Sequence, residues 1–104
     1  AAHFEQAVLK SLSEFPNARA ILIIGHSINR VDASGVEKLR ALNRDLQAAG
    51  ITLVLAGLKK QVVQALERAD LQQDLGEENI IPSTATAIKI LEERFPEPHV
   101  RQVI

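Results

Sequence analysis

Cysteine, methionine, tryptophan and tyrosine are all absent from this sequence, and phenylalanine occurs only three times. Without cysteine the chain forms no disulfide and offers no thiolate to a metal or a substrate, which suits a reducing compartment. The scarcity of aromatic rings disfavours a surface on which nucleic-acid bases stack. Because even position 1 is not methionine, we expect the chain to be a processed product or a piece of a longer protein.

An excess of charge of one sign is also missing. The sequence carries 12 Lys and Arg against 13 Asp and Glu, for a formal net charge of -1. The two signs alternate along the chain, which disfavours binding to nucleic acid or to an anionic membrane surface. The longest apolar run, from Ala20 to Ile24, is far shorter than the roughly 20 residues that cross a bilayer. The sequence therefore predicts no membrane span within this chain.

Three apolar runs predict strands. A chain of this length is expected to form one domain with a single core. The runs from Ala20 to Ile24 and from Ile51 to Ala56 are rich in Ile, Leu and Val, which is typical of strands buried on both faces. A shorter run, from Asn79 to Ile81, precedes a proline.

Four segments with helical spacing of apolar residues surround these strands. The residues expected on their inner faces are Phe4, Val8, Leu12 and Phe15; Val36, Leu39, Leu42 or Asn43, and Leu46; Val62, Leu66 and Ala69; and Ile88, Leu91 and Phe95. Pro16 and Asn17 follow the first segment, Gly50 follows the second, and Ser83 precedes the fourth as a candidate cap. The alternation of helix and buried strand predicts an α/β fold with a mostly parallel central sheet and about four helices.

The number of strands is small for this number of helices. Three strands make a narrow sheet, and the first helix precedes all of them. We therefore expect that one or two N-terminal strands are missing before Ala1, or that the segment from His99 to Ile104 adds a strand at the edge. Val100, Gln102 and Ile104 alternate weakly in that segment.

The tetrapeptide Asp32-Ala33-Ser34-Gly35 is the strongest functional candidate, because it places a hydroxyl where a helix is expected to begin. Backbone N–H groups in the first turn of a helix lack partners and carry partial positive charge, so they would stabilise a phosphate bound to or beside Ser34. The same serine, with Glu37 three residues later, also fits a capping box. The two readings are compatible, because a capping serine can become a regulatory phosphate when it is modified.

The other candidate sites have weaker patterns. Ser34, His26 and Asp32 could suggest a nucleophilic triad, but the sequence has no G-x-S-x-G turn, and His26 fits a partly solvated loop residue. The three histidines lie far apart, so no metal site is predicted, and no glycine-rich phosphate loop is present. Lys59 and Lys60 follow a strand and open a helix, where an anion could be contacted weakly.

The order of these elements and several motifs resemble the STAS domain, which bacterial anti-sigma-factor antagonists share with the cytoplasmic C-terminal region of SulP-type anion transporters. The likeness runs from about Ala2 to Phe95 and includes VDASGV at 31–36 and LGEENIIP at 75–82. In the anti-sigma-factor antagonists of this family, the third position of D-[ST]-S-G is the serine that a partner kinase phosphorylates, and that position is Ser34 here. Position 33 departs from the pattern, because alanine replaces the usual serine or threonine.

The GEENIIP run and the AHF opening at residues 2–4 are more similar to the STAS domains of transporters. The resemblance implies that residues 1–104 are a single, non-catalytic STAS domain without a cofactor, part of a longer anion (sulfate-type) transporter and located on the cytoplasmic side of the inner (plasma) membrane. Its implied partners are the transmembrane portion of that transporter and a soluble regulatory protein or serine kinase. A free-standing anti-sigma-factor antagonist is the alternative, and weak nucleotide binding is a third hypothesis.

Overall fold

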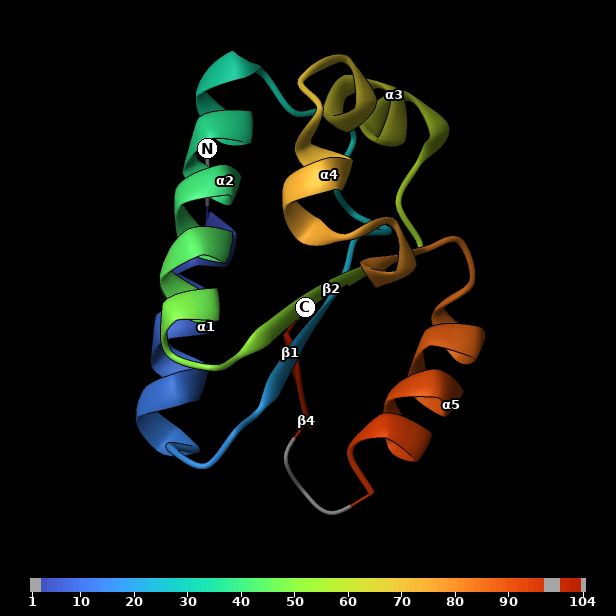
Figure 1. The fold of residues 1–104 in the computed structure, drawn as a ribbon. Coiled ribbons are helices and arrows are strands. Elements are labelled where there is room, and N and C mark those ends of the chain that lie inside the picture. The colour runs from blue at the N-terminus through green and yellow to red at the C-terminus, as the bar shows by residue number, and fades with distance from the viewer. Residues whose placement is uncertain (1–2, 97–99, 104) are drawn as a thin grey trace.

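The computed structural model describes residues 3–96 and 100–103, in which helices and strands alternate around one sheet (Figure 1). The elements, in chain order, are α1 (His3–Glu14), β1 (Ala20–Ile24), α2 (Ala33–Ala48), β2 (Thr52–Ala56), α3 (Lys60–Arg68), α4 (Leu71–Leu75), the 3-10 helix η1 (Glu77–Asn79), β3 (Ile80–Ile81), α5 (Thr84–Arg94) and β4 (Val100–Val103).

The four strands of the described residues lie parallel in the order β3-β2-β1-β4. β1 and β2 pair along their whole length, from Ala20 opposite Thr52 to Ile24 opposite Ala56. The predicted α/β class with a mostly parallel sheet is therefore confirmed. β4 pairs with β1 and confirms the strand predicted in the tail, although His99 and Ile104, the bounds of that prediction, lie outside the described residues.

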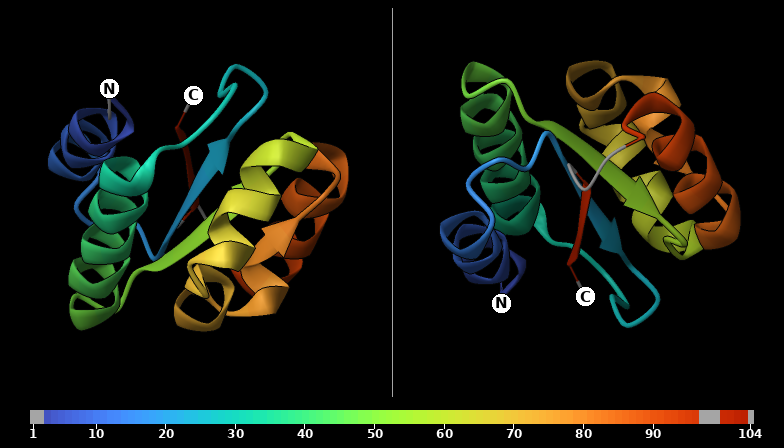
Figure 2. Two further views of the ribbon diagram at one scale, coloured as in Figure 1. Left: turned by 90° about the horizontal axis from the view of Figure 1, so that it is seen from above. Right: turned by 90° about the horizontal axis from the view of Figure 1, so that it is seen from below.

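Successive side chains of β1 and β2 enter two different cores, because strand residues alternate between the faces of a sheet. One core joins one face of the sheet to α1, α2, α3 and α4, and the other joins the opposite face to α5. In Figure 1 the sheet runs between α1 and α2 on one side and α5 on the other, and both views in Figure 2 show α1 beside α2. Each leucine or isoleucine buried in these cores stabilises the fold by about 1.5–3 kcal/mol.

The predicted inner faces of the second and third helices are confirmed. Their buried residues are Val36, Leu39, Leu42, Asn43, Leu46, Val62 and Leu66. Ala69, also predicted on the third face, ends α3 as its C-cap and packs against the same core.

The predicted faces of the first and fourth helices are partly wrong. Val8 is fully buried and Leu12 packs against the core, but Phe15 is 41% exposed because α1 ends at Glu14 and the helical spacing stops there. The side chain of Phe4 lies outside the described side chains. In α5 two of the three predicted positions are confirmed, and Ala87 takes the place of Ile88 in the core. Ala87 and Leu91 are buried, Phe95 packs beside them, and Ile88 is 38% exposed.

The helix ends follow the expected chemistry, with one additional helix. Gly50 has a φ of +77° directly after the C-cap of α2, and the Ser83 hydroxyl accepts a hydrogen bond from the backbone N–H of Thr86 at 3.2 Å. Both predictions are confirmed.

The described residues contain five α-helices instead of about four, because left-handed Asp70 (φ 56°) separates α3 from the short α4, which has too few residues for a periodic pattern. No helix of residues 3–96 has the length and apolar character needed to span a bilayer.

Candidate functional site

The tetrapeptide with Ser34 lies at the carboxyl edge of the sheet. β1 ends at Ile24, and an eight-residue loop, residues 25–32, leads into α2 at Ala33. This loop projects beyond the end of β1 in Figure 2. Open parallel sheets bind ligands and partners at this edge, because the loops that follow neighbouring strands converge there.

Asp32, rather than Ser34, caps α2. Its backbone is extended (φ -89°, ψ 177°), and its carboxylate accepts a hydrogen bond from the backbone N–H of Gly35 at 2.8 Å. This carboxylate satisfies one of the unpaired N–H groups of the first turn and places a negative charge at the positive end of the helix dipole.

The predicted capping box of Ser34 and Glu37 is therefore wrong. The helix begins one residue before Ser34, so the hydroxyl lies within the first turn, where its side chain is exposed and makes no hydrogen bond to the described residues. Glu37 instead accepts from Arg40 Nε at 3.4 Å, one turn further along α2. The Ser34 hydroxyl is therefore exposed and is not engaged in capping α2.

A cleft of about 370 Å³ opens beside Ser34 and is called the Ser34 cleft below. Its apolar lining includes Ile28, Val31, Leu39, Leu58, Val62 and Leu66. Arg30 and Lys38 also line it, and both side chains are exposed and form no ion pair with the residues that the structure describes. The Ser34 cleft thus combines an apolar wall, two unpaired cations, the capping carboxylate of Asp32 and the first turn of α2.

The loop of residues 25–32, which leads into the helix turn with Ser34, is tied to two other parts of the same edge. His26 Nε2 and Thr84 Oγ1, at the start of α5, are 3.1 Å apart and hydrogen-bonded. Gly57 has a φ of +66°, and a Cβ atom there would lie 2.4 Å from His26 Nε2, so only glycine fits this position. The exposed imidazole was predicted as a loop residue, and its partner is Thr84 instead of Ser34.

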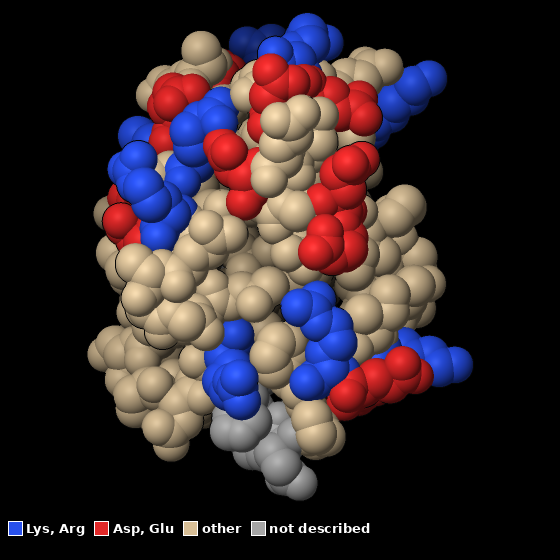
Figure 3. All heavy atoms as spheres, viewed as in Figure 1, with Lys and Arg blue, Asp and Glu red and all other residues tan. Residues whose placement is uncertain are grey.

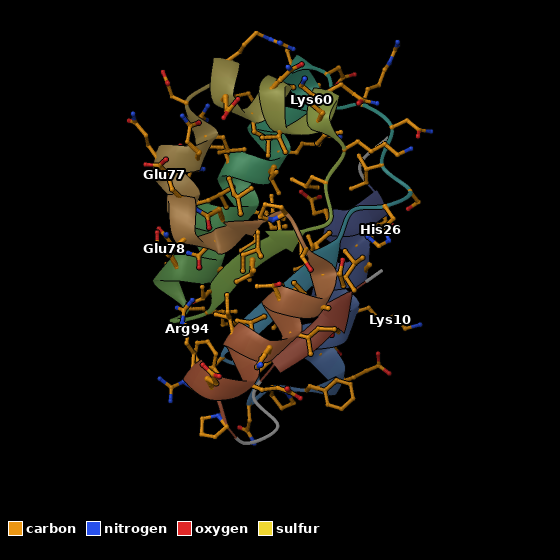
Figure 4. All side chains as sticks on the ribbon, turned by 90° about the vertical axis from the view of Figure 1, so that its right-hand side faces the viewer. Lys10, His26, Lys60, Glu77, Glu78 and Arg94 are labelled. Atoms are coloured by element: carbon orange, nitrogen blue, oxygen red, sulfur yellow. The ribbon has the colours of Figure 1, made fainter. Side chains whose placement is uncertain are left out.

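Lys59 and Lys60 take different positions. Lys59 Nζ is hydrogen-bonded to Asn29 Oδ1, and Gln61 Nε2 donates to Asn29 O at 3.1 Å, so these side chains hold the loop from the α3 side. Lys60 is exposed at the start of α3, where Figure 4 labels it. Neither lysine lines the Ser34 cleft. The anion contact proposed for this doublet stays a prediction.

Side-chain hydrogen bonds also join α2 to α4, and they fix the orientation of α2 and of its first turn. The Arg40 guanidinium bonds to the Asp74 carboxylate and donates to Ala69 O at 2.8 Å, and Asn43 Nδ2 donates to Asp74 O at 3.1 Å. Burial alone would lower the pKa of Arg40, but the Asp74 hydrogen bond and the nearby carboxylates outweigh it and raise the pKa. Arg40 therefore stays charged at any physiological pH.

The sequence reasoning did not single out Arg30, Lys38 and Leu58. Lys38 lies four residues after Ser34 on α2, a helical spacing that could have indicated a shared surface with the serine. Arg30 lies in the loop before the helix, where this spacing carries no such signal. Leu58 comes from a distant segment, and no local pattern links it to the serine. In the described part of the chain, no three His, Asp or Glu side chains are grouped so that they could hold a metal ion.

Three comparisons place this arrangement among known proteins. A family model described as the STAS domain matches residues 1–87. "Sulfate transporter 2.2" of Arabidopsis thaliana is 34% identical over 87 residues, which is 83% of this chain and 12% of the plant protein. The solved structure of the SulP transporter STAS domain from Vibrio cholerae superposes with a TM-score of 0.77 at 17% identity, over 92% of this chain and 77% of that one. The chain thus spans about an eighth of the length of the curated relative that it matches.

Proposed function

The chain belongs to the STAS domain family, and from that membership we propose that it is a non-catalytic regulatory domain of a SulP-type anion transporter, located on the cytoplasmic side of the membrane. The observation that carries this proposal is the 34% identity to a segment of a sulfate transporter. The shared fold with a SulP transporter STAS domain supports it. The resemblance drawn from the 31–36 and 75–82 motifs is confirmed at the level of the family.

The proposed partner of this domain is the transmembrane portion of the same transporter, with the Ser34 cleft as the docking surface. Its apolar wall would bury a side chain of the partner, and Arg30 and Lys38 would pair with acidic groups beside it. In the structure the rim of the cleft is exposed, as a docking surface must be.

Phosphorylation of Ser34 by a serine kinase is the proposed switch. A phosphate adds roughly 1.5 to 2 negative charges and three acceptor oxygens at this position. The free N–H groups of the first turn, together with Arg30 and Lys38 on the same cleft, would stabilise it. Because the phosphate would then occupy the cations that the partner uses, modification is expected to weaken docking.

Binding of the transmembrane portion to three forms of the domain tests the switch. The wild-type and Ser34→Ala forms are expected to bind equally, and Ser34→Asp about tenfold more weakly, which corresponds to about 1.4 kcal/mol. Ser13→Asp is the matched control, because Ser13 is also exposed and lies in the last turn of α1 rather than on the cleft. Equal affinities for all four forms would remove Ser34 from the switch.

A free-standing anti-sigma-factor antagonist is the second candidate, since the D-x-S-G motif at 32–35 and its exposed serine serve that function equally well. In that case the unmodified domain would capture a kinase-type anti-sigma factor. The coding sequence around the chain separates the two candidates. Hydrophobic spans in the same reading frame support the transporter, and neighbouring kinase and sigma-factor genes support the antagonist.

A further inference from the structure

A second cleft, of about 230 Å³, lies on the other side of α3 and is called the acidic cleft below. Leu58 and Leu66 line both clefts. Val63, Ile80 and Pro82 complete much of the apolar lining of the acidic cleft. A single helix therefore separates two hollows that share part of one apolar wall.

The rim of this second cleft is acidic. Glu67 and Glu77 line it, and both side chains are exposed and free of ion pairs with the described residues. They belong to a segment, residues 67–78, with five acidic residues (Glu67, Asp70, Asp74, Glu77 and Glu78) and one basic residue (Arg68). Asp74 is already paired with Arg40. In Figure 3 acidic side chains gather over the part of the surface formed by α4 and η1.

Gln72 also lines this cleft. It belongs to α4, and its carboxamide oxygen is buried and has no partner among the described residues. A buried carbonyl oxygen without a partner costs free energy, so a donor that enters the cleft and meets it after a rotation of the carboxamide would gain a hydrogen bond at little cost.

We propose that the acidic cleft binds a lysine- or arginine-bearing segment of another polypeptide, with the apolar stem of the basic side chain on the leucine wall and its charged head between Glu67 and Glu77. Lysine and arginine fit these walls because both have an apolar stem below a cationic head that donates hydrogen bonds. The charge of the rim favours a cationic occupant and disfavours an acidic one. A donor that reached the Gln72 oxygen after a rotation of the carboxamide would also satisfy that buried acceptor.

A cytoplasmic loop of the transmembrane portion is the occupant to which this proposal commits, and this identification rests on the proposed function. Cytoplasmic loops of membrane proteins carry an excess of lysine and arginine close to the membrane. The domain would then contact its transporter through two surfaces of opposite charge. The Ser34 cleft would be the contact that phosphorylation controls, and the acidic cleft would be a constant one.

Binding of a labelled short peptide that alternates lysine and leucine tests the acidic cleft on this chain. Neutralising both carboxylates, in the double variant Glu67→Gln and Glu77→Gln, is expected to weaken binding about tenfold at low salt. Gln72→Leu, which removes the acceptor and keeps the apolar bulk, is expected to weaken it about threefold. The double variant Glu92→Gln and Glu93→Gln is the matched control, since it removes two exposed charges from α5.

Three results would overturn the proposal: no binding of the peptide, equal loss of affinity in the two double variants, or self-association of the chain through this cleft in sedimentation experiments. A matched peptide with glutamate in place of lysine must not bind. The Ser34→Asp variant is expected to bind the basic peptide like the wild type. Failure of the Ser34 switch and failure of the acidic cleft therefore give different results.

Discussion

The two clefts beside α3 share part of an apolar wall and differ in the charge of their rims. Leu58 and Leu66 line both, but Arg30 and Lys38 border the Ser34 cleft, and Glu67 and Glu77 border the acidic cleft. In Figure 4 His26, in the loop that precedes α2, lies on one side of the molecule and Glu77 lies on the other. The comparison shows that buried leucines supply part of the wall of both hollows, whereas loops and exposed helix positions set the charge of each rim.

Truncation of Leu66, a leucine that lines both clefts, should have the largest effect on stability and on binding. Leu66 is 1% exposed, so Leu66→Ala leaves a cavity and is expected to lower the free energy of unfolding by about 2–5 kcal/mol and to weaken binding at both clefts. Urea denaturation measures the loss. Leu9→Ala is the control, because Leu9 is 57% exposed and its truncation should change stability by less than about 0.5 kcal/mol. Similar losses in both variants would contradict this account of the wall.

Removal of the Asp32 cap should affect the Ser34 cleft and leave the acidic cleft unchanged. Asp32→Ala takes away the acceptor for the Gly35 N–H and is expected to cost about 1 kcal/mol of stability. Amide hydrogen exchange should rise in the first turn of α2, while binding of the basic peptide at the acidic cleft stays unchanged. Asp45→Ala, at an exposed position inside α2, is the matched control. If the two variants lose equal stability, Asp32 is not the cap of the helix.

A negative charge at Ser34 should change the stability least. Whether such a charge stabilises or destabilises the fold should depend on which end of a helix carries it. Ser34→Asp places a negative charge in the first turn of α2 and is expected to stabilise the fold by about 0.3–1 kcal/mol at low salt. Ser13→Asp places the same charge in the last turn of α1 and should destabilise slightly. Thermal unfolding at two salt concentrations checks both signs, and equal shifts of the two variants would contradict the dipole argument.

The central strands and α2 could be predicted from the sequence because their signals are local. Continuous apolar runs appear only where both faces of a strand are buried, and the spacing of Val36, Leu39 and Leu46 fits one helical face. The first turn of α2 could not be predicted in detail, because Asp32 and Ser34 are both good capping residues. Which of them ends the extended loop depends on the backbone conformation that the whole loop adopts.

The clefts could not be predicted from the sequence at all. The Ser34 cleft joins residues near position 30 to Leu58 and Leu66, and the acidic cleft joins α3 to Ile80 and Pro82, so each depends on the packing of distant segments. The exposed faces of Phe15 and Ile88 were also mispredicted, because the spacing of apolar residues does not show where a helix ends or which side a neighbour covers.

The affinity of the transmembrane portion for the domain with and without a phosphate on Ser34 tests the central claim most directly. The account predicts that the phosphorylated domain binds about tenfold more weakly, since the phosphate would lie on the same cleft as Arg30 and Lys38 and compete with the partner for them. Equal affinity of the two forms, measured with an intact acidic cleft, would contradict the claim that Ser34 controls docking.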